Sequence, residues 1–417
     1  MIQPENREIN RFRRMQFNNF AQITIPYLAA FVDENDFEIR LVDEYNQRIP
    51  YHRHFDLVAI TVNTPNASHC YAISARFRAQ GAKTVMGGPH ATLLPDEVCE
   101  HCDFLLIGES EETWTLFLSD FINDKPRALY RSITAPLLEN LPFPRWDLLK
   151  RNRLMKGAVF ATRGCPHHCR YCNLKQIYHP HFRTRPIEEV IHEIKRLRSK
   201  FFVFWDDNLF ADKEHAKKLL QAIKPLKRKW AAQVTLHDCA DDELLKLAKS
   251  AGCLYLFIGL ESFSENSLSD AGKSINQPNH YKTIIDLIHR NRIMIQAGIV
   301  FGFDSDTKTI FNDTLAACEQ LGIDGTTVSI LTPLPKTPVY EQLKTEGRLL
   351  HENWKEYNGK TAVTFQPKNM STDELWKGYI MFRKRFYTLS SFIRRINVSR
   401  TNRLVNFIMN LGYRLGV

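Results

Sequence analysis

The sequence predicts an α/β protein in which a doubly wound, Rossmann-like sheet precedes a partial (β/α)6 barrel and a helical tail. Short apolar runs alternate with helical patterns through most of the 417 residues, as expected for parallel sheets covered by helices. In the second half, polar or turn residues follow each apolar run, which is typical of barrel strands. We therefore expect domains at 1–135, 157–345 and 346–417, with a linker at 136–156.

The first domain is predicted from one near-continuous apolar run and the elements around it. Residues 56–62 have the composition of a buried parallel strand, and a helical pattern follows at 68–80. Almost nothing precedes Pro4, so an opening strand would be very short, unless the true start lies further upstream. The other expected elements are a helix at 26–34, strands at 38–43, 84–86 and 104–107, and a loop at 87–92.

The second domain is predicted from six apolar runs with polar ends. The expected strands lie at 158–160, 201–205, 230–235, 253–259, 293–301 and 325–331. Parallel strands of a barrel bring their carboxyl ends to one mouth, where loops converge and chemistry takes place. The polar residues at or just beyond these ends are Asp206, Asp207, Gln233, Glu261 and Asp304.

Three cysteines follow the first barrel strand in a tight cluster. Cys165, Cys169 and Cys172 form a Cys-x3-Cys-x2-Cys pattern, and no fourth cysteine follows at ligand spacing. Three thiolates at this spacing suit a [4Fe-4S] cluster with one iron left open for a ligand. Structural zinc needs four ligands, and the adjacent His167 and His168 are poorly spaced to complete such a site. A disulfide set is disfavoured because the number is odd and the sequence shows no signal peptide.

This motif, with the aromatic Tyr171 before the third cysteine, resembles the radical S-adenosylmethionine (radical SAM) superfamily. The resemblance implies that the open iron chelates S-adenosylmethionine and that the reduced cluster cleaves it to methionine and a 5′-deoxyadenosyl radical. The cofactor contacts it implies are Tyr171, Asp206, Gln233, Glu261, Ser262 and Gly298. Residues 333–338 match the family's Pro-Leu-Pro-Gly-Thr-Pro segment, but Lys336 replaces its glycine, so we expect a differently shaped loop.

The first domain resembles the cobalamin-binding domain that precedes many radical SAM barrels. The resemblance covers about residues 20–125 and depends on segments 41–43, 87–92, 95–97 and 108–111. The Asp-x-His-x-x-Gly motif that supplies a cobalt ligand elsewhere is absent, so the sequence names no cobalt ligand. The contacts implied for cobalamin are Thr61, Thr64, Gly87, Gly88 and His90.

Two further cysteines, Cys99 and Cys102, form a lone Cys-x2-Cys pair. No second pair accompanies them, and we expect no metal there.

The net charge of +10 lies largely in the tail, where residues 371–417 carry nine Lys or Arg against two acids. A helix is expected to begin at Ser371 and to continue through Leu389, and the stretch 404–411 is amphipathic. The second helix either packs on the barrel or lies on a membrane surface. Nine cysteines, no signal peptide and no apolar run of eighteen residues predict a cytoplasmic protein, and no nucleic-acid partner is expected.

The resemblance implies a cobalamin-dependent radical enzyme that methylates an unactivated carbon of a small-molecule or lipid-like substrate. An electron donor such as flavodoxin or ferredoxin would reduce the cluster. Oxidative cyclisation or rearrangement is the alternative chemistry within the same layout. A methylthiotransferase is disfavoured because its first domain has cluster cysteines of its own, whereas only Cys70, Cys99 and Cys102 precede this barrel. A non-catalytic cobalamin or iron sensor is disfavoured by the intact cysteine triad.

Overall fold

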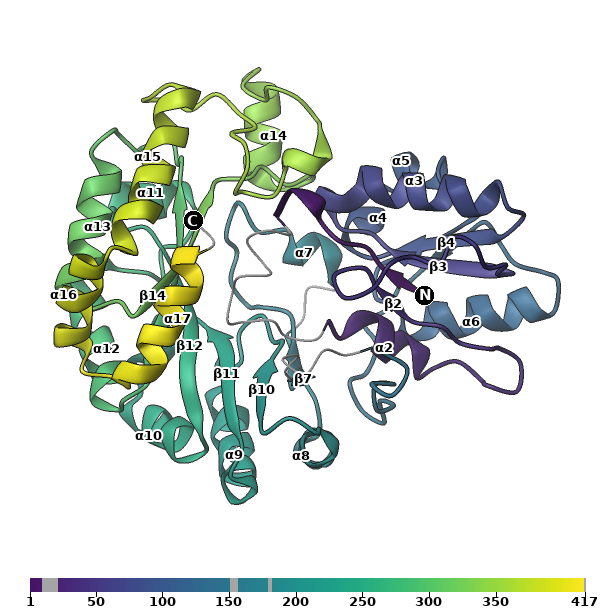
Figure 1. Cartoon of the computed structure of the whole chain (residues 1–417), viewed down its shortest axis with the longest axis horizontal. Helices are drawn as coiled ribbons and strands as arrows, with labels where there is room; N and C mark the ends of the chain where they lie inside the picture. Colours follow the sequence, from purple (N-terminus) through teal and green to yellow (C-terminus); the bar gives the residue numbers. More distant parts are fainter. Residues whose placement is uncertain (10–21, 151–156, 179–181, 416–417) are drawn as a thin grey trace.

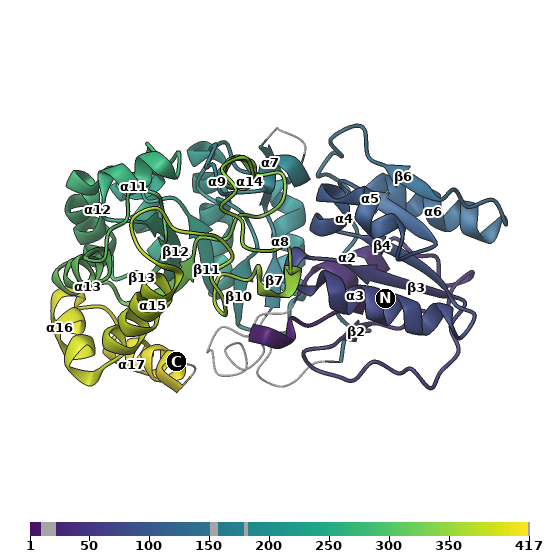
Figure 2. The ribbon, with the colours of Figure 1, turned by 90° about the horizontal axis from the view of Figure 1, so that it is seen from above.

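The structure is a computed structural model that describes residues 1–9, 22–150, 157–178 and 182–415. Two α/β units lie side by side, the first sheet on the right of Figure 1 and the barrel on the left. Figure 2 shows the same two units from above, with the carboxyl-terminal helices at the far end of the barrel from the first unit.

The first unit is a parallel sheet of six strands in the order β2-β1-β3-β4-β5-β6. The expected opening strand is present as two residues, Ile2 and Gln3, which pair with β2 and β3. The strands are β1 (Ile2–Gln3), β2 (Val42–Asp43), β3 (Leu57–Thr61), β4 (Lys83–Gly87), β5 (Phe104–Ile107) and β6 (Leu129–Arg131).

Helices cover both faces of this sheet, as the doubly wound fold requires. One face packs on α3 through Ile60, Ile73 and Phe77, and the other packs on α6 through Phe104 and Phe117. The helices are α2 (Thr24–Ala29), α3 (Ala67–Arg78), α4 (Pro89–Leu93), α5 (Pro95–Cys99) and α6 (Glu111–Ile122).

The segment after β4 differs from the sequence prediction. Residues 87–92 were expected to form a loop, but a short helix, α4, begins at Pro89. Gly88 precedes it with φ +102° and ψ −173°, a conformation that only glycine adopts readily. Proline has its fixed φ preset for the first turn of a helix, so this Gly-Pro pair starts a helix rather than extending a loop.

The second unit is a half-barrel of six parallel strands in the order β14-β13-β12-β11-β10-β7. All six strands expected from the sequence are present. They are β7 (Gly157–Val159), β10 (Phe201–Phe204), β11 (Lys229–Val234), β12 (Cys253–Glu261), β13 (Met294–Phe301) and β14 (Gly325–Ile330).

Helices surround the half-barrel and bury a large apolar core against it. A small antiparallel pair flanks the segment with the three cysteines: β8 (Thr162–Arg163) precedes it and β9 (Arg183–Thr184) follows it. The helices are α7 (Leu174–Ile177), α8 (Ile187–Arg196), α9 (Lys213–Ile223), α10 (Asp242–Ser250), α11 (Glu265–Asp270), α12 (Pro278–Arg290), α13 (Ile310–Gln320) and α14 (Pro338–Thr345).

The tail forms α15 (Thr372–Phe386), α16 (Leu389–Ser399) and α17 (Arg403–Leu415). The predicted helix start is confirmed, because Ser371 and Glu374 form a reciprocal capping box. The helix was expected to continue through Leu389, but α15 ends at Phe386. Thr388 caps a new helix by accepting a hydrogen bond from the Ser391 amide, so the chain turns there.

The described part of the linker ties the two units together. The Arg145 amide donates to the Pro26 carbonyl at 2.8 Å, and Trp146 is buried in the barrel core. Residues 151–156 of the predicted linker lie outside the described residues. Within the described parts of the chain, no helix is both long and apolar enough to span a bilayer.

Candidate active site

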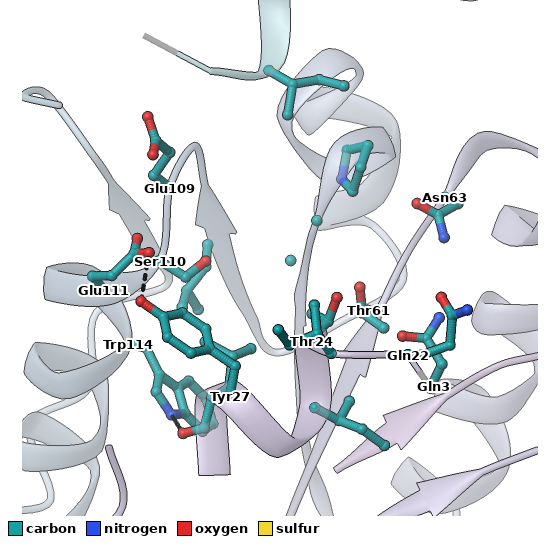
Figure 3. Close-up of a pocket in the computed structure, with 18 of the residues that line it drawn as sticks. Gln3, Gln22, Thr24, Tyr27, Thr61, Asn63, Glu109, Ser110, Glu111 and Trp114 are labelled. Carbon is teal, nitrogen blue, oxygen red and sulfur yellow. Dashed lines mark hydrogen bonds between the residues drawn. The ribbon is translucent and has the colours of Figure 1, made fainter. Parts of the chain in front are cut away.

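The carboxyl ends of both sheets face one shared cavity of about 350 Å³. The first sheet contributes Thr61, Gly87, Gly88 and Gly108 to its wall, together with α2 and the start of α6. Figure 3 shows the polar side chains on this side, including Gln3, Thr61, Asn63 and Glu109. The barrel contributes Thr162, Arg163, Trp205 and Asp207. The cavity is therefore bounded by strand ends of both units.

The three cysteines lie in the loop between β8 and α7. All three thiols are free and partly exposed. Burial raises their pKa values, to about 12 for Cys172, while the His167 and Leu174 amides stabilise the thiolates of Cys165 and Cys172. Thiols in such a position ionise readily only beside a cation, which the irons of a cluster supply. This donor set therefore fits a [4Fe-4S] cluster.

No three His, Cys, Asp or Glu side chains within the described residues are arranged to hold a single metal ion. A cubane cluster does not need such an arrangement, because each cysteine binds a different iron.

Two aspartates that follow β10 brace the cysteine loop from below. Asp206 accepts hydrogen bonds from the Ala161 and Thr162 amides, at 3.1 and 2.5 Å, and from the Thr162 hydroxyl at 2.6 Å. Asp207 accepts from the Gly164 amide at 3.1 Å. Burial raises the pKa of Asp206 to about 7 and that of Asp207 to about 6, against these donors. Asp206 therefore fixes the backbone that leads into the cysteine loop, and its predicted contact with S-adenosylmethionine stays a prediction.

A buried ion pair lies beside the cysteines at the end of β12. The Lys273 ammonium donates to Glu261 at 2.7 Å and to the Gly259 carbonyl at 2.9 Å. Burial, with Glu261 and Cys169 nearby, raises the pKa of Tyr171 well above its usual value. Glu261 has φ +64°, and the pairing register with β13 shifts there. Strained backbone of this kind is concentrated at functional sites.

The ionisation of this pair is set by competing effects. Burial lowers the pKa of Lys273, but Glu261 and the nearby thiols outweigh burial, so the pKa lies above its usual value. Lys273 is therefore a fixed positive charge next to Cys165 and Cys169.

Charged residues also join the cysteine loop to the first domain, in a cluster that we call the seam: Glu109, Glu111, Arg163 and Arg183. Arg163 contacts Glu109 and Glu111 at 2.6 Å each, and Arg183 contacts Glu109 at 2.7 Å. Burial would raise the pKa of Glu109, but the two arginines hold it below its usual value. Tyr27 donates to Glu111 at 3.0 Å, as the dashed line in Figure 3 marks.

Comparisons with known proteins agree with this geometry. The model of the radical SAM superfamily matches residues 159–316, and that of the B12 binding domain matches residues 18–118. Bacteriochlorophyllide d C-12(1)-methyltransferase of Chlorobaculum tepidum is 30% identical over 369 residues, covering 85% of this chain and 80% of that protein. The chain belongs to the radical SAM superfamily, in the group with an N-terminal B12 binding domain.

Further relatives support the same group. Hopanoid C-2 methylase of Rhodopseudomonas palustris is 26% identical, covering 70% of this chain and 56% of that protein. The structure of the methyltransferase TsrM from Kitasatospora setae, with cobalamin and a [4Fe-4S] cluster, matches with a TM-score of 0.67 at 17% identity, covering 83% of this chain and 77% of that one. A model for a domain of unknown function (DUF4070) matches residues 337–405.

These findings confirm the predicted family, fold class and enzyme class. A radical SAM enzyme with a B12 binding domain uses a [4Fe-4S] cluster, S-adenosylmethionine and cobalamin, so the predicted cofactor set is confirmed at the level of the family.

The residues predicted to contact cobalamin separate into two sets in this radical SAM protein. Thr61, Gly87 and Gly88 line the shared cavity. Thr64 and His90 are buried behind it, and His90 lies 3.2 Å from the Thr64 hydroxyl and 3.4 Å from Glu97. Their contacts in the structure belong to the interior of the B12 binding domain. No histidine is found among the described residues that line the cavity.

The residues predicted to contact S-adenosylmethionine surround the cysteine loop on the barrel side. Gln233 is exposed and donates to the Asp207 carbonyl at 3.1 Å, and Ser262 is buried next to the strained Glu261. A β-carbon at Gly298 in β13 would lie 3.1 Å from the Phe257 ring of β12, so a larger residue there requires that ring to shift. Their contact with the cofactor stays a prediction.

Sequence reasoning missed Lys273, the seam arginines and Trp205. Lys273 follows β12 by twelve residues and reaches the site only because α11 folds back. Arg163 carried a usable signal, because it immediately precedes the Gly-Cys of the motif. Trp205 directly follows β10, and its side chain, 43% exposed, lines the cavity.

Proposed function

We propose that this protein transfers a methyl group to an unactivated carbon of a large apolar molecule, with its domains limited at 1–135, 157–345 and 346–417. The observation that carries the proposal is the shared cavity: its walls combine the glycine strand ends of the B12 binding domain with Arg163, Trp205 and Asp207 of the barrel. A cobalamin on the first wall would therefore face the cluster side across a single chamber.

The chain's own residues divide the work. Cys165, Cys169 and Cys172 would hold the cluster, and Asp206 and Asp207 fix the loop that carries them. Lys273, Glu261 and Tyr171 would offer an ammonium, a carboxylate and a hydroxyl to the amino acid part of S-adenosylmethionine. When bound, the cluster supplies an electron, cleaved S-adenosylmethionine supplies the hydrogen-abstracting radical, and methylcobalamin supplies the methyl group.

The substrate class is proposed from the cavity wall and the relatives. Apolar groups such as Ile25, Leu28, Phe160 and Trp205 form much of the wall. The relatives above are named for a bacteriochlorophyllide and a hopanoid, both extended and largely apolar. We therefore propose an extended apolar substrate. We also propose a flavodoxin- or ferredoxin-type electron donor for the cluster. The proposed location is the cytoplasm, with peripheral membrane contact.

The test is an anaerobic assay of the reconstituted holoprotein with S-adenosylmethionine that carries a deuterated methyl group. Bacteriochlorophyllide d and a hopanoid are the probe substrates. Methyl transfer predicts a product that carries the label, together with 5′-deoxyadenosine and S-adenosylhomocysteine. Cys172→Ala should form none of these products. The proposal fails if a cobalamin-loaded enzyme makes 5′-deoxyadenosine but neither S-adenosylhomocysteine nor labelled product.

Oxidative cyclisation is the second candidate, because anaerobic magnesium-protoporphyrin IX monomethyl ester cyclase of Cereibacter sphaeroides is 24% identical, covering 80% of this chain. That chemistry predicts 5′-deoxyadenosine with an oxidised, unlabelled product, so the same assay separates the two reactions.

A further inference from the structure

The last two helices bury several polar residues against the barrel and leave seven large apolar residues exposed. In α17, Asn406 and Asn410 are buried, whereas in α16 Ser391, Arg395 and Ser399 are buried. The outward side chains are Leu389, Ile393 and Val398 on α16 and Leu404, Phe407, Ile408 and Leu411 on α17, between 42% and 68% exposed. We call these seven residues the outer face. Surface helices normally show the opposite arrangement.

The buried polar residues form a bonded network against the barrel. Asp324, just before β14, accepts from the Thr401 hydroxyl at 2.6 Å and from the Asn406 amide. Arg395 donates to the Ile323 carbonyl at 2.8 Å and to Asn410 at 2.9 Å. The helix pair therefore cannot roll over to bury its apolar side without removing two partners of the buried Asp324 carboxylate and the carbonyl partners of the buried Arg395 guanidinium.

The apolar side chains form an organised surface. Residues 404, 407, 408 and 411 follow helical spacing along one side of α17. The Phe392 ring of α16 meets the Phe407 ring of α17 edge-on at 5.8 Å, which joins the two helices. Figures 1 and 2 both show the pair together at the end of the molecule away from the B12 binding domain.

Positive charge surrounds the outer face. The stretch 389–417 contains five arginines and no acid. Arg394, Arg400, Arg403 and Arg414 are exposed, and Arg394 alone of these pairs with an acid in the described structure, Glu319 at 2.7 Å. A cleft beside Arg400 adds three more basic residues and one acid: Lys249, Arg290, Arg292 and Asp286.

We infer that α16 and α17 form a docking element for an anionic lipid bilayer. The outer face would enter the acyl boundary, and the arginines would contact headgroup phosphates, as in interfacial amphipathic helices. Charge complementarity favours lipid over a second copy of this chain, because a two-fold contact would bring the same basic rim against itself. This docking rests on the peripheral membrane contact proposed above and names the surface that makes it, and its failure would leave the proposed chemistry unaffected.

The test is co-flotation of the full-length protein with phosphatidylcholine vesicles, with and without phosphatidylglycerol. We expect binding to the anionic vesicles that weakens with salt, and little binding to the neutral ones. Leu404→Ser with Phe407→Ser and Leu411→Ser should lower the bound fraction at least about tenfold. Arg400→Gln with Arg403→Gln and Arg414→Gln should abolish the preference for anionic lipid.

The matched control is Ile133→Ser with Leu137→Ser, which removes apolar side chains that are 83% and 72% exposed but lie outside the tail. This control should bind as the parent does. A second readout is Phe407→Trp, whose fluorescence should shift to shorter wavelength with anionic vesicles. The inference is overturned if the parent binds no vesicle, or if the control variant loses binding as much as the serine variant does. It is also overturned if the parent is a dimer without vesicle binding and the serine variant is a monomer.

Discussion

The two sheets present their strand ends to the same cavity but supply different residues there. The first sheet supplies glycines and a threonine, with Gly87, Gly88 and Gly108 on the cavity wall, and Glu109 and Glu111 follow β5 there. The barrel supplies Arg163, Trp205 and Asp207 to the wall, and its strand ends also carry Asp206, Glu261 and the loop with the cysteines. The first edge lets a ligand approach the backbone closely, whereas the barrel edge also carries the thiols and the buried Glu261–Lys273 pair.

This difference suggests that the first sheet accommodates a bulky cofactor and that the barrel activates S-adenosylmethionine. A bulky cofactor needs backbone that it can approach closely, which glycine allows. Cluster and radical chemistry need thiolates and fixed charges, which must be braced because buried charges without partners are costly. The seam residues Arg163 and Glu109 link the two edges, so the cavity depends on both units.

The largest effect should come from removing one cluster ligand on the barrel side. Cys172→Ala should lower the iron content from about four per chain to under one and abolish S-adenosylmethionine cleavage, because the cluster loses a ligand. The measurement is iron analysis after anaerobic reconstitution. Cys99→Ala, an exposed cysteine with no ligand partners predicted, is the control and should keep its iron. Equal iron in both variants would contradict the assignment.

The second largest effect should come from breaking the seam between the two units. Glu109→Gln leaves Arg163 and Arg183 short of a buried carboxylate, so the free energy of unfolding should fall by about 3 kcal/mol. Urea unfolding measures it. Asp120→Asn, which removes the partner of the exposed Arg127, should cost less than about 1 kcal/mol. Similar losses in the two variants would show that the seam does not hold the units together.

A glycine variant tests accommodation on the first sheet. A β-carbon at Gly88 would lie 3.0 Å from the Thr61 hydroxyl in a backbone region that costs about 1–3 kcal/mol for other residues. Gly88→Ala should therefore weaken cobalamin binding about tenfold or more, and iron content should not change. Gly81→Ala shares a positive φ but meets no atom within 4 Å, so it should bind normally. Loss of iron in Gly88→Ala would contradict the division between edges.

The pH dependence of stability tests the brace under the cysteine loop. Burial raises the folded-state pKa of Asp206 to about 7, above the unfolded value near 3.9. The stabilisation that protonated Asp206 adds to the free energy of unfolding is therefore complete below about pH 4, and it is lost as the pH rises through 7. Between pH 6 and pH 8, the free energy of unfolding of the apoprotein should fall by about 1 kcal/mol more in the parent than in Asp206→Asn. Parallel pH profiles would refute a buried, protonated Asp206.

The smallest effect is expected at the barrel loop where Lys336 replaces the family's glycine. Lys336 has φ +63°, a left-handed conformation that glycine adopts without strain, and the different loop shape stays a prediction. Lys336→Gly should raise the unfolding free energy by up to about 1 kcal/mol, because glycine adopts this conformation without steric cost. Thermal unfolding measures the change. A destabilised variant would show that the lysine side chain contributes to the loop.

The sequence predicted the parts of this molecule that depend on local pattern. Six barrel strands and the capped start of α15 follow from apolar runs and a Ser-x-x-Glu box. The helix at Pro89 and the break before Leu389 were missed, because both depend on single caps between apolar segments. The interior position of His90 was missed because it depends on distant partners: its ring stacks edge-on with Trp354, far along the chain.

The most direct test of the account is the cobalt-to-iron ratio after anaerobic reconstitution with iron, sulfide and hydroxocobalamin, followed by desalting. Both edges of the cavity are predicted to be loaded, with about one cobalt and about four irons per chain. Four irons without cobalt would contradict the account, because the glycine edge would then accommodate no cofactor and methyl transfer from cobalamin would have to be abandoned.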